Sequence, residues 1–375
     1  MRVLVTGGAG FVGSHTVDLL LSHGLDVIVL DNLDGQVHQG GGFPANLKRH
    51  ETDAHLEVVR ADVRDAEAVG RALDGVEAIL HLAAAVGVGQ SMYEPRHYAD
   101  ANLTGTAALL QCVLERRPRL RKLVVASSMS IYGEGAYRCP SCREDRAVSA
   151  AARRFDGGWE PRCSECGVPL RAVPTGENKP LEPSSIYAIT KRTQEEMILC
   201  FGRAYAVPAV ALRYFNIYGP RQALSNPYTG VIAIFLSRLL NGRAPLVFED
   251  GLQTRDFIHV SDIANANVAA LTSAGDDPAV LNVGTGRPTT VVELARSLAA
   301  ALDIEAAPVM LQRLRVGDVR HCCAATEAIQ RRLGWEARVD LRDGLADVLD
   351  WARDQRPVDR ADDAMRELLR QGLVQ

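Results

Sequence analysis

The sequence predicts an α/β fold in which a doubly wound parallel sheet is followed by a smaller mixed α/β lobe. Two observations predict the sheet. In the first half of the 375-residue chain, short β-branched runs alternate with helical patterns, and a glycine-rich turn joins the first run to the first helix. Alternation of this kind is typical of parallel strands covered by helices on both faces. A third feature, two C-x-x-C pairs, marks a separate insert.

The strands of the sheet are expected where short apolar, β-branched runs occur. They are Val3–Thr6, Val27–Asp31, Leu56–Arg60, Ala78–His81, Leu123–Ala126 and, later, Ala209–Arg213. Apolar residues at helical spacing predict helices at Gly13–His23, Ala66–Leu73, Tyr98–Glu115, Ser184–Tyr205, Gly230–Leu240, Asp262–Thr272 and Thr289–Leu302. We therefore expect a sheet domain over residues 1–213, with the insert at 136–172. Residues 214–375 should mainly form the second lobe, with 255–285 partly returning to the sheet domain.

The composition is that of an ordinary globular protein, with 47% hydrophobic and 23% charged residues. The formal net charge of −4 gives no basic surface, so neither nucleic acid nor an anionic membrane is expected as a partner. A strand begins near Arg2 and no apolar run approaches a membrane span, so we expect a cytoplasmic protein. Cytoplasmic thiols stay reduced, and the eight cysteines therefore need a role other than disulfides.

The turn after the first strand has the spacing of a dinucleotide site, with Gly7, Gly10 and Gly13 at G-x-x-G-x-x-G. Glycines let the backbone approach a pyrophosphate, and the following helix N-terminus supplies N–H donors. Asp31 ends the second strand, where a carboxylate can accept hydrogen bonds from ribose hydroxyls and would repel a 2′-phosphate. Asp62, after the third strand, can accept from an adenine amino group. The turn predicts a Rossmann-like site for NAD.

Tyr187 and Lys191 form a Tyr-x-x-x-Lys pair in a predicted helix. Residues four apart share a helix face, so the ammonium can lie beside the phenol. A phenol has a pKa near ~10 and is a poor base at neutral pH, whereas a nearby cation favours the phenolate. Such a pair can take a proton from a hydroxyl whose carbon gives up hydride. The same spacing is also common on exposed helix faces.

With these motifs, the segments VVASSMSIYGE, ALRYFNIYGPRQ and FEDGLQTRDFIHVSDIA make the chain resemble the extended short-chain dehydrogenase/reductase family. The likeness is to its nucleoside-diphosphate-sugar epimerase/dehydratase branch and runs from residue 2 to about Trp351. It implies Tyr187, Lys191 and Ser128 as catalytic residues, with Ser128 bonded to the reacting sugar oxygen. The cofactor residues are expected to be Gly7, Gly10, Phe11, Val12, Gly13, Asp31, Asn32, Asp62, Val63, Leu82, Ala83, Ala84, Asn102, Tyr187, Lys191 and Phe215. The substrate residues are expected to be Ser128, Asn216, Val231, Phe248, Arg255, Arg315 and Asp318.

The resemblance also implies a homodimer. Its seam would pair the helices predicted at Tyr98–Glu115 and Ser184–Tyr205 with their symmetry mates. The apolar side chains available for that seam, or alternatively for the core, are Leu109, Leu110, Ile198 and Leu199.

Departures from the family pattern indicate the reaction. In 4,6-dehydratases of the branch, the catalytic Ser/Thr is followed by an Asp-Glu acid/base pair. Here Ser128 is followed by Met129 and Ser130, so elimination is disfavoured. What remains is oxidation at C4 of the sugar, rotation of the 4-keto sugar and return of hydride to its other face, which is 4-epimerisation.

The segments AAAVGVGQSMYEP and PRQALSNPYTGVIAIF look most like the dTDP-L-rhamnose 4-epimerase group, which makes dTDP-6-deoxy-L-talose. A UDP-glucose or UDP-glucuronate 4-epimerase is the alternative. A dehydratase, or a non-catalytic NAD-binding interaction protein, is a more distant one.

The insert carries Cys139 and Cys142, then twenty residues, then Cys163 and Cys166. Two C-x-x-C knuckles at that separation indicate a zinc ribbon, because each knuckle turns two thiolates toward one tetrahedral ion. Four thiolates leave no open position, so the zinc would be structural. A redox dithiol pair and unliganded cysteines are the alternatives.

Overall fold

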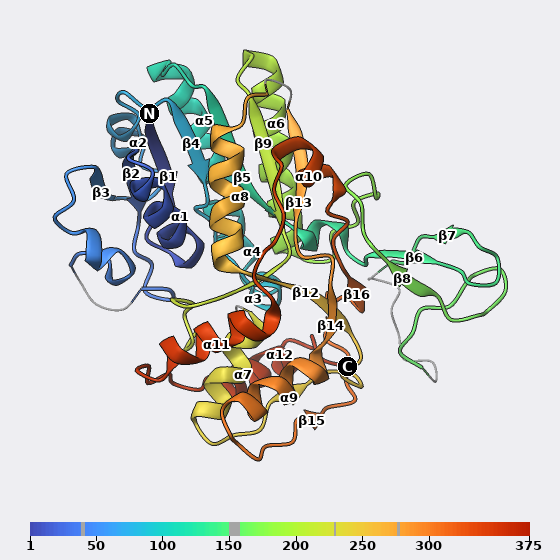
Figure 1. Cartoon of the computed structure of the whole chain (residues 1–375). Helices are drawn as coiled ribbons and strands as arrows, with labels where there is room; N and C mark the ends of the chain where they lie inside the picture. Colours follow the sequence, from blue (N-terminus) through green and yellow to red (C-terminus); the bar gives the residue numbers. More distant parts are fainter. Residues whose placement is uncertain (39–41, 150–157, 229, 276–277) are drawn as a thin grey trace.

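A seven-stranded parallel sheet forms the larger part of the computed structural model, which describes residues 1–38, 42–149, 158–228, 230–275 and 278–375 (Figure 1). The strand order is β13-β9-β5-β4-β1-β2-β3. The strands are β1 (Arg2–Thr6), β2 (Asp26–Asp31), β3 (Leu56–Arg60), β4 (Ala78–His81), β5 (Lys122–Ser128), β9 (Ala209–Tyr214) and β13 (Ala279–Val283). All six pairings are parallel. The predicted doubly wound sheet is confirmed, and its order reverses between β1 and β4.

Two hydrophobic cores cover the two faces of this sheet, because successive strand residues point to opposite sides. Val3 and Val5 of β1 pack with α1 (Phe11–Ser22) and α8 (Val260–Thr272). Leu4 packs on the other face with α2 (Ala66–Ala72), α5 (Gly105–Arg116) and α6 (Ile186–Tyr205). Leu109, Leu110, Ile198 and Leu199, which the sequence left between core and dimer seam, are buried in this second core.

The helix predicted at Tyr98–Glu115 is present as a continuous helical run whose hydrogen-bonding pattern changes along its length. Its successive parts are α4 (Pro95–Tyr98), a π-helical stretch η2 (Ala99–Thr104) and α5. Within the π-helical stretch, the buried Asn102 side chain accepts from Ala85 N at 2.7 Å and donates to Ala85 O at 3.2 Å. A bulge of this kind is often found at functional sites, and here it holds the chain that leaves β4.

The second lobe is smaller and mixed, as predicted. Its core lies between α7 (Val231–Leu240), α9 (Val291–Ala301) and α11 (Leu341–Ala352). β12 (Thr254–His259) pairs in parallel with β10 (Asn216–Tyr218) and β16 (His321–Cys322), and antiparallel with β14 (Pro288–Thr290). Apart from the three strands of the insert, the other elements of the described chain, in both lobes, are η1 (Ala45–His50), α3 (Val88–Ser91), η3 (Met129–Tyr132), β11 (Leu246–Val247), β15 (Val309–Met310), α10 (Glu327–Leu333) and α12 (Ala361–Arg370). Because β13 rejoins the large sheet, the chain crosses between the lobes more than once, and the boundary at residue 213 stays a prediction.

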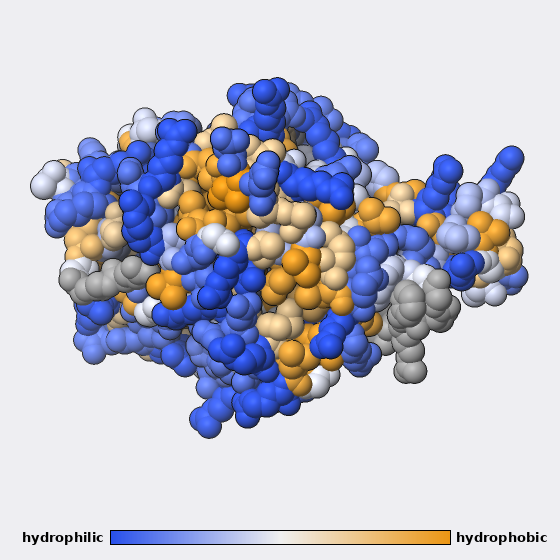
Figure 2. Space-filling model, turned by 90° about the horizontal axis from the view of Figure 1, so that it is seen from below, coloured by the Kyte–Doolittle hydropathy of each residue, from blue (hydrophilic) through white to orange (hydrophobic). Residues whose placement is uncertain are grey.

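The insert forms an arm that stands out from the body of the molecule (Figures 1 and 2). Its antiparallel sheet has the order β7-β6-β8 and consists of β6 (Ala136–Arg138), β7 (Asp145–Arg146) and β8 (Arg171–Val173). Part of the predicted insert, residues 150–157, lies outside the described residues. Over the part of the chain that the structure describes, no helix has the length and apolar character needed to cross a membrane.

Candidate active site

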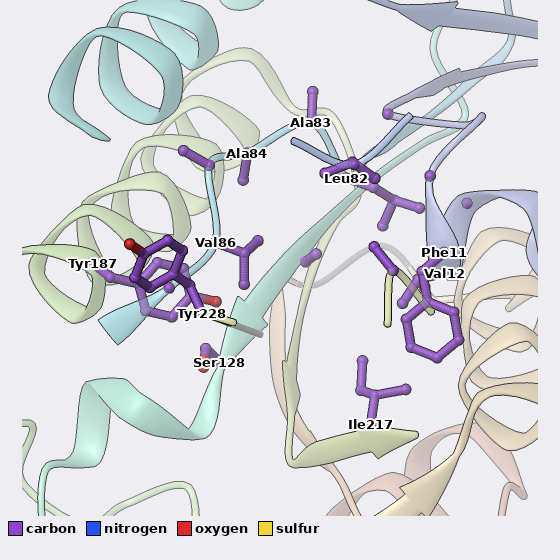
Figure 3. A pocket seen from close by; sticks show the side chains of 18 of the residues that line it. Phe11, Val12, Leu82, Ala83, Ala84, Val86, Ser128, Tyr187, Ile217 and Tyr228 are labelled. Atoms are coloured by element: carbon purple, nitrogen blue, oxygen red, sulfur yellow. The ribbon is translucent and has the colours of Figure 1, made fainter. Parts of the chain in front are cut away.

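A cavity of about 490 Å³ lies at the carboxyl ends of the central strands, where the strand order reverses. This is the place where open α/β sheets bind ligands. Figure 3 shows Tyr187 and Ser128 at one end of it and Phe11, Val12 and Ile217 at the other. Most of the predicted site residues line it: Gly7, Gly10, Phe11, Val12, Gly13, Asp31, Asn32, Asp62, Val63, Leu82, Ala83, Ala84, Ser128, Tyr187, Lys191, Phe215, Asn216 and Val231.

The glycine turn is as tight as its spacing predicted. Gly7 has φ +70°, a conformation that favours glycine. A Cβ at Gly13 would lie 2.3 Å from Gly7 O, so α1 can approach the turn this closely only without a side chain. Gly10 is the N-cap of α1, and its own Cβ would meet Gly7 O at 3.3 Å. The turn thus presents bare backbone and a helix N-terminus to the cavity, which fits a pyrophosphate.

The two predicted carboxylates stand at the ends of neighbouring strands. Asp31 accepts hydrogen bonds from Ala9 N at 3.0 Å and Leu33 N at 2.9 Å, so its carboxylate is fixed toward the cavity it lines. Asp62 pairs with Arg64 at 2.7 Å, and this hydrogen bond outweighs partial burial and lowers the pKa of Asp62 to about 2. Asp62 is therefore an anionic acceptor at neutral pH.

Tyr187 is positioned by the start of α6. Ser185 caps the helix by accepting from Ala188 N at 3.1 Å, and Tyr187 N donates to Ser91 Oγ of α3 at 3.0 Å. The phenol packs edge-on against the ring of Tyr98, with 6.3 Å between centroids. Burial raises the pKa of Tyr187 to about 12, although a hydrogen bond with Ser128 opposes the shift. The structure therefore brings Ser128 and Tyr187 together at the cavity.

Lys191 is 3% exposed and donates to Gln194 Oε1 at 2.8 Å. Gln194 in turn contacts Thr106 and His81, so the ammonium is anchored to a buried polar chain behind the cavity. Burial lowers the pKa of Lys191 to about 7. Desolvation disfavours the charged form of both Tyr187 and Lys191. The phenolate thus needs a further positive charge in the cavity.

The two residues after Ser128, Met129 and Ser130, have side chains that are neither general acids nor general bases. Met129 is buried, and Ser130 donates its hydroxyl to Ser128 Oγ at 2.9 Å. Both line the cavity where the dehydratase pattern has its Asp-Glu pair. Behind them, Ser127 and Arg213 share the buried carboxylate of Glu195, with contacts of 2.6 Å to each.

Sequence reasoning missed a polar group at the cavity. Gln90 Oε1 accepts from Tyr98 Oη at 3.0 Å and from Gln36 Nε2 at 3.1 Å, and Gln36 also reaches Asn226 Oδ1 at 3.4 Å. These residues, with Tyr228, line the cavity from four separate segments. The segments of Gln90, Asn226 and Tyr228 contributed to the likeness to the dTDP-L-rhamnose 4-epimerase group, but no spacing rule brings these side chains together.

Five predicted residues do not line the cavity: Asn102, Phe248, Arg255, Arg315 and Asp318. Asn102 instead holds the loop after β4 through its contacts with Ala85. The other four lie in the second lobe near one another. Asp318 accepts from Arg255 at 2.8 Å and from Arg315 at 2.9 Å, and the Arg315 guanidinium lies 5.3 Å from the centroid of the Phe248 ring.

The four insert cysteines converge as their spacing predicted. Their sulfurs all lie within 4.8 Å of one another, with 3.5 Å from Cys139 to Cys166 and 3.9 Å from Cys142 to Cys163. Four sulfurs placed tetrahedrally at about 2.3 Å from one ion are about 3.8 Å apart. A hydrogen bond from the Arg146 guanidinium lowers the pKa of Cys163 to about 6. This geometry fits a zinc ion.

The comparison with known proteins agrees with a dinucleotide-binding cavity. Residues 3–152 and 163–284 match the NAD dependent epimerase/dehydratase family. The chain belongs to this family. The family assignment confirms the branch predicted from the motifs, and the stretch between the two matched ranges falls in the insert.

Similar members of the family are sugar-nucleotide epimerases by name. A dTDP-L-rhamnose 4-epimerase of Burkholderia thailandensis is 34% identical over 360 residues, covering 93% of this chain and 94% of that protein. A UDP-N-acetylglucosamine 4-epimerase from Methanobrevibacter ruminantium, in complex with UDP-N-acetylmuramic acid, is 29% identical with a TM-score of 0.77, covering 95% and 99% of the chains. A Thermus thermophilus UDP-glucose 4-epimerase in complex with NAD is 31% identical with a TM-score of 0.72, covering 95% and 100%.

Proposed function

We propose that the protein is an NAD-dependent nucleoside-diphosphate-sugar 4-epimerase. The observation that carries this proposal is one cavity that joins the glycine turn to Ser128 and Tyr187, with Met129 and Ser130 where a dehydratase has its acid and base. Membership of the family and the names of the similar epimerases support it.

In the proposed reaction, Tyr187 takes the proton of the sugar 4-hydroxyl and later returns it. Ser128 hydrogen-bonds the same sugar oxygen and Tyr187, so it orients both groups. Lys191, held by Gln194, lies on the same helix face and supplies positive charge there in its protonated form. When bound, oxidised NAD supplies the hydride acceptor and a positive charge in the cavity that favours the phenolate.

We expect no net NADH during turnover, because the hydride taken from C4 returns to C4. Absorbance at the NADH band should stay below about one equivalent of enzyme while the sugar is inverted through many turnovers. Continuous accumulation of NADH in proportion to substrate would identify a dehydrogenase and contradict the epimerase assignment.

The proposed diphosphate site is formed by Arg255 and Arg315, with Asp318 holding both. Guanidinium groups are suited to a diphosphate because they donate charge-assisted, bidentate hydrogen bonds. Arg315 Nε is buried without a hydrogen-bond partner in the structure, so it has an N–H available for a ligand. We also propose that Phe248 packs against the nucleotide, since its ring already lies against Arg315.

For the sugar we propose dTDP-L-rhamnose and dTDP-6-deoxy-L-talose as the pair interconverted. The Burkholderia epimerase supports this choice, whereas the similar UDP-glucose 4-epimerases support UDP-glucose as the alternative. A similar protein solved with UDP-glucuronic acid and NAD, 28% identical to this chain, supports UDP-glucuronate. The test is to incubate the protein with each nucleotide sugar and assign the product by NMR. Inversion at C4 in one of them supports the proposal. A 4-keto-6-deoxy product formed from UDP-glucose, which starts with a hydroxyl at C6, would instead show a dehydratase.

We also propose that residues 1–213 and 214–375 act as the NAD-binding and substrate-binding parts. A homodimer through α5 and α6 is proposed as well. The exposed Ile189 on α6 leaves that helix an apolar side chain for such a contact.

We propose one structural zinc ion bound by Cys139, Cys142, Cys163 and Cys166. Elemental analysis should find about one zinc per chain. Cys163→Ser should remove it, because the variant lacks one of the four thiolates that a closed tetrahedral site needs. Cys200→Ser, an exposed cysteine on α6, is the matched control and should keep the metal. Zinc-free protein whose eight thiols all react in the native state would overturn this proposal.

A further inference from the structure

Arg320 is a fully buried arginine surrounded by carboxylates. Its Nη1 donates to Glu249 at 2.8 Å and to Asp250 at 2.6 Å, and its Nη2 donates to Asp250 at 3.1 Å. The third carboxylate comes from the insert: Glu160 Oε1 accepts from Nε at 2.9 Å and from Nη2 at 2.5 Å. Every N–H of the guanidinium therefore has a carboxylate partner, and one of those partners is supplied by the arm.

Glu160 also contacts His321, the residue after Arg320. Its Oε2 lies 2.9 Å from His321 Nε2, while His321 Nδ1 accepts from Thr254 N at 3.2 Å. His321 Nδ1 also lies 2.8 Å from Thr254 Oγ1, so the ring is held between Thr254 and Glu160. Burial acts to raise the pKa of Glu160, but the hydrogen bonds from His321 and Arg320 outweigh it and lower the pKa to about 2. Glu160 is thus an anion that binds two consecutive residues, Arg320 just before β16 and His321 at its start.

Residues that flank the arm also bind the segment around Arg320. Glu134, at the start of the arm, accepts from Arg320 N at 2.7 Å and from Tyr137 Oη at 2.7 Å. Gly135 N donates to His321 O at 2.8 Å, and Thr175 N, after β8, donates to Cys323 O at 2.8 Å. The segment from Arg320 to Cys323 is therefore held along one side by the residues that flank the arm, next to β6 and β8 (Figure 1).

On its other side, this part of the chain supplies hydrogen-bond acceptors for the Arg255 guanidinium. The Arg255 guanidinium donates to Arg320 O at 3.1 Å, to Val319 O at 2.7 Å and to Asp318 Oδ1 at 2.8 Å. Asp318 also accepts from Arg315. A displacement of residues 318–320 would consequently move the acceptors that aim both arginines.

We propose that Glu160 of the insert is a positioning residue for the diphosphate site, which it sets by fixing Arg320 and His321 behind Arg255 and Asp318. This inference rests on the proposed function, because it takes those arginines to bind a nucleoside diphosphate. It gives the cysteine cluster a role in substrate affinity: the cluster orders the chain at Cys163, three residues from Glu160. Glu160 lies between the two ranges that match the family, so the device belongs to this chain's own insert.

The test is calorimetric titration of the holoenzyme with dTDP and with UDP. Glu160→Ala should weaken binding of the preferred diphosphate by about tenfold, a change of about 1.4 kcal/mol, while the NAD and zinc content per chain stay unchanged. Glu160→Gln keeps an acceptor for Arg320 and should recover part of the loss. Glu165→Ala, an exposed glutamate in the second knuckle, is the matched control and should bind as the unaltered protein does.

A merely structural Glu160 would lower the melting temperature and leave the diphosphate Kd unchanged, and that result would overturn the inference. Cys163→Ser should also weaken diphosphate binding, because it loosens the chain that places Glu160. The double variant with Glu160→Ala should therefore bind the diphosphate no more weakly than whichever single variant binds it less tightly. Additive losses in the double variant would contradict the shared route. Failure of the unaltered protein to bind either diphosphate would instead contradict the proposed function, and this inference with it.

Discussion

Tyr187→Phe should lower turnover by at least ~10²-fold, the scale expected when a general acid–base group is removed. The ring keeps its place between Tyr98 and the cavity wall, so NAD content and melting temperature should remain close to those of the unaltered protein. Tyr205→Phe is the matched control, because Tyr205 lies at the far end of the same helix and is 55% exposed. The measurement is the rate of C4 inversion under saturating nucleotide sugar.

Retention of most of the activity by Tyr187→Phe would assign the base to another residue. Loss of NAD together with activity would show that the phenol serves cofactor binding rather than proton transfer.

Gly13→Ala should abolish NAD retention. The added Cβ would lie 2.3 Å from Gly7 O and 2.6 Å from Gly8 Cα, and both are backbone atoms that cannot rotate away. Overpacking costs about 1–3 kcal/mol even where side chains can adjust, and here the pyrophosphate turn itself must move. Gly35→Ala is the control, because a Cβ there has no neighbour within 4 Å.

The measurement for Gly13→Ala is NAD released per chain on denaturation, with the melting temperature recorded beside it. A variant that keeps stoichiometric NAD would show that the cofactor does not depend on the close approach of α1 to the turn.

The central sheet could be predicted because its signals are local. β3 and β4 begin and end where the apolar runs do, and Gly7 and Gly13 are explained by contacts within the turn. The cysteine cluster was predictable for the same reason, since two knuckles of fixed spacing define most of its geometry. Tyr187 and Lys191 needed one further step, the placement of both residues on the first turns of α6 beside Ser128.

The remaining features depend on contacts between distant segments. Gln36 and Asn226 lie in loops and Gln90 lies in α3, so these side chains meet only through the tertiary fold, and no periodicity in their segments indicates a site. The π-helical stretch contains Asn102, which binds the backbone of Ala85, and the helical pattern of the sequence gives no sign of that tertiary contact. Glu160 and Arg320 are 160 residues apart, and a glutamate in a polar loop gives no sign of such a partner.

The most direct test of the account follows the hydrogen at C4. A nucleotide sugar that carries deuterium at C4 should be converted in ordinary water into its C4 epimer with the label retained at C4, as observed by NMR. Retention is predicted because Tyr187 exchanges only the hydroxyl proton with solvent, whereas the carbon-bound hydrogen never leaves the cavity. Loss of the C4 label, or uptake of solvent hydrogen at C3 or C5, would contradict epimerisation by transient oxidation at C4.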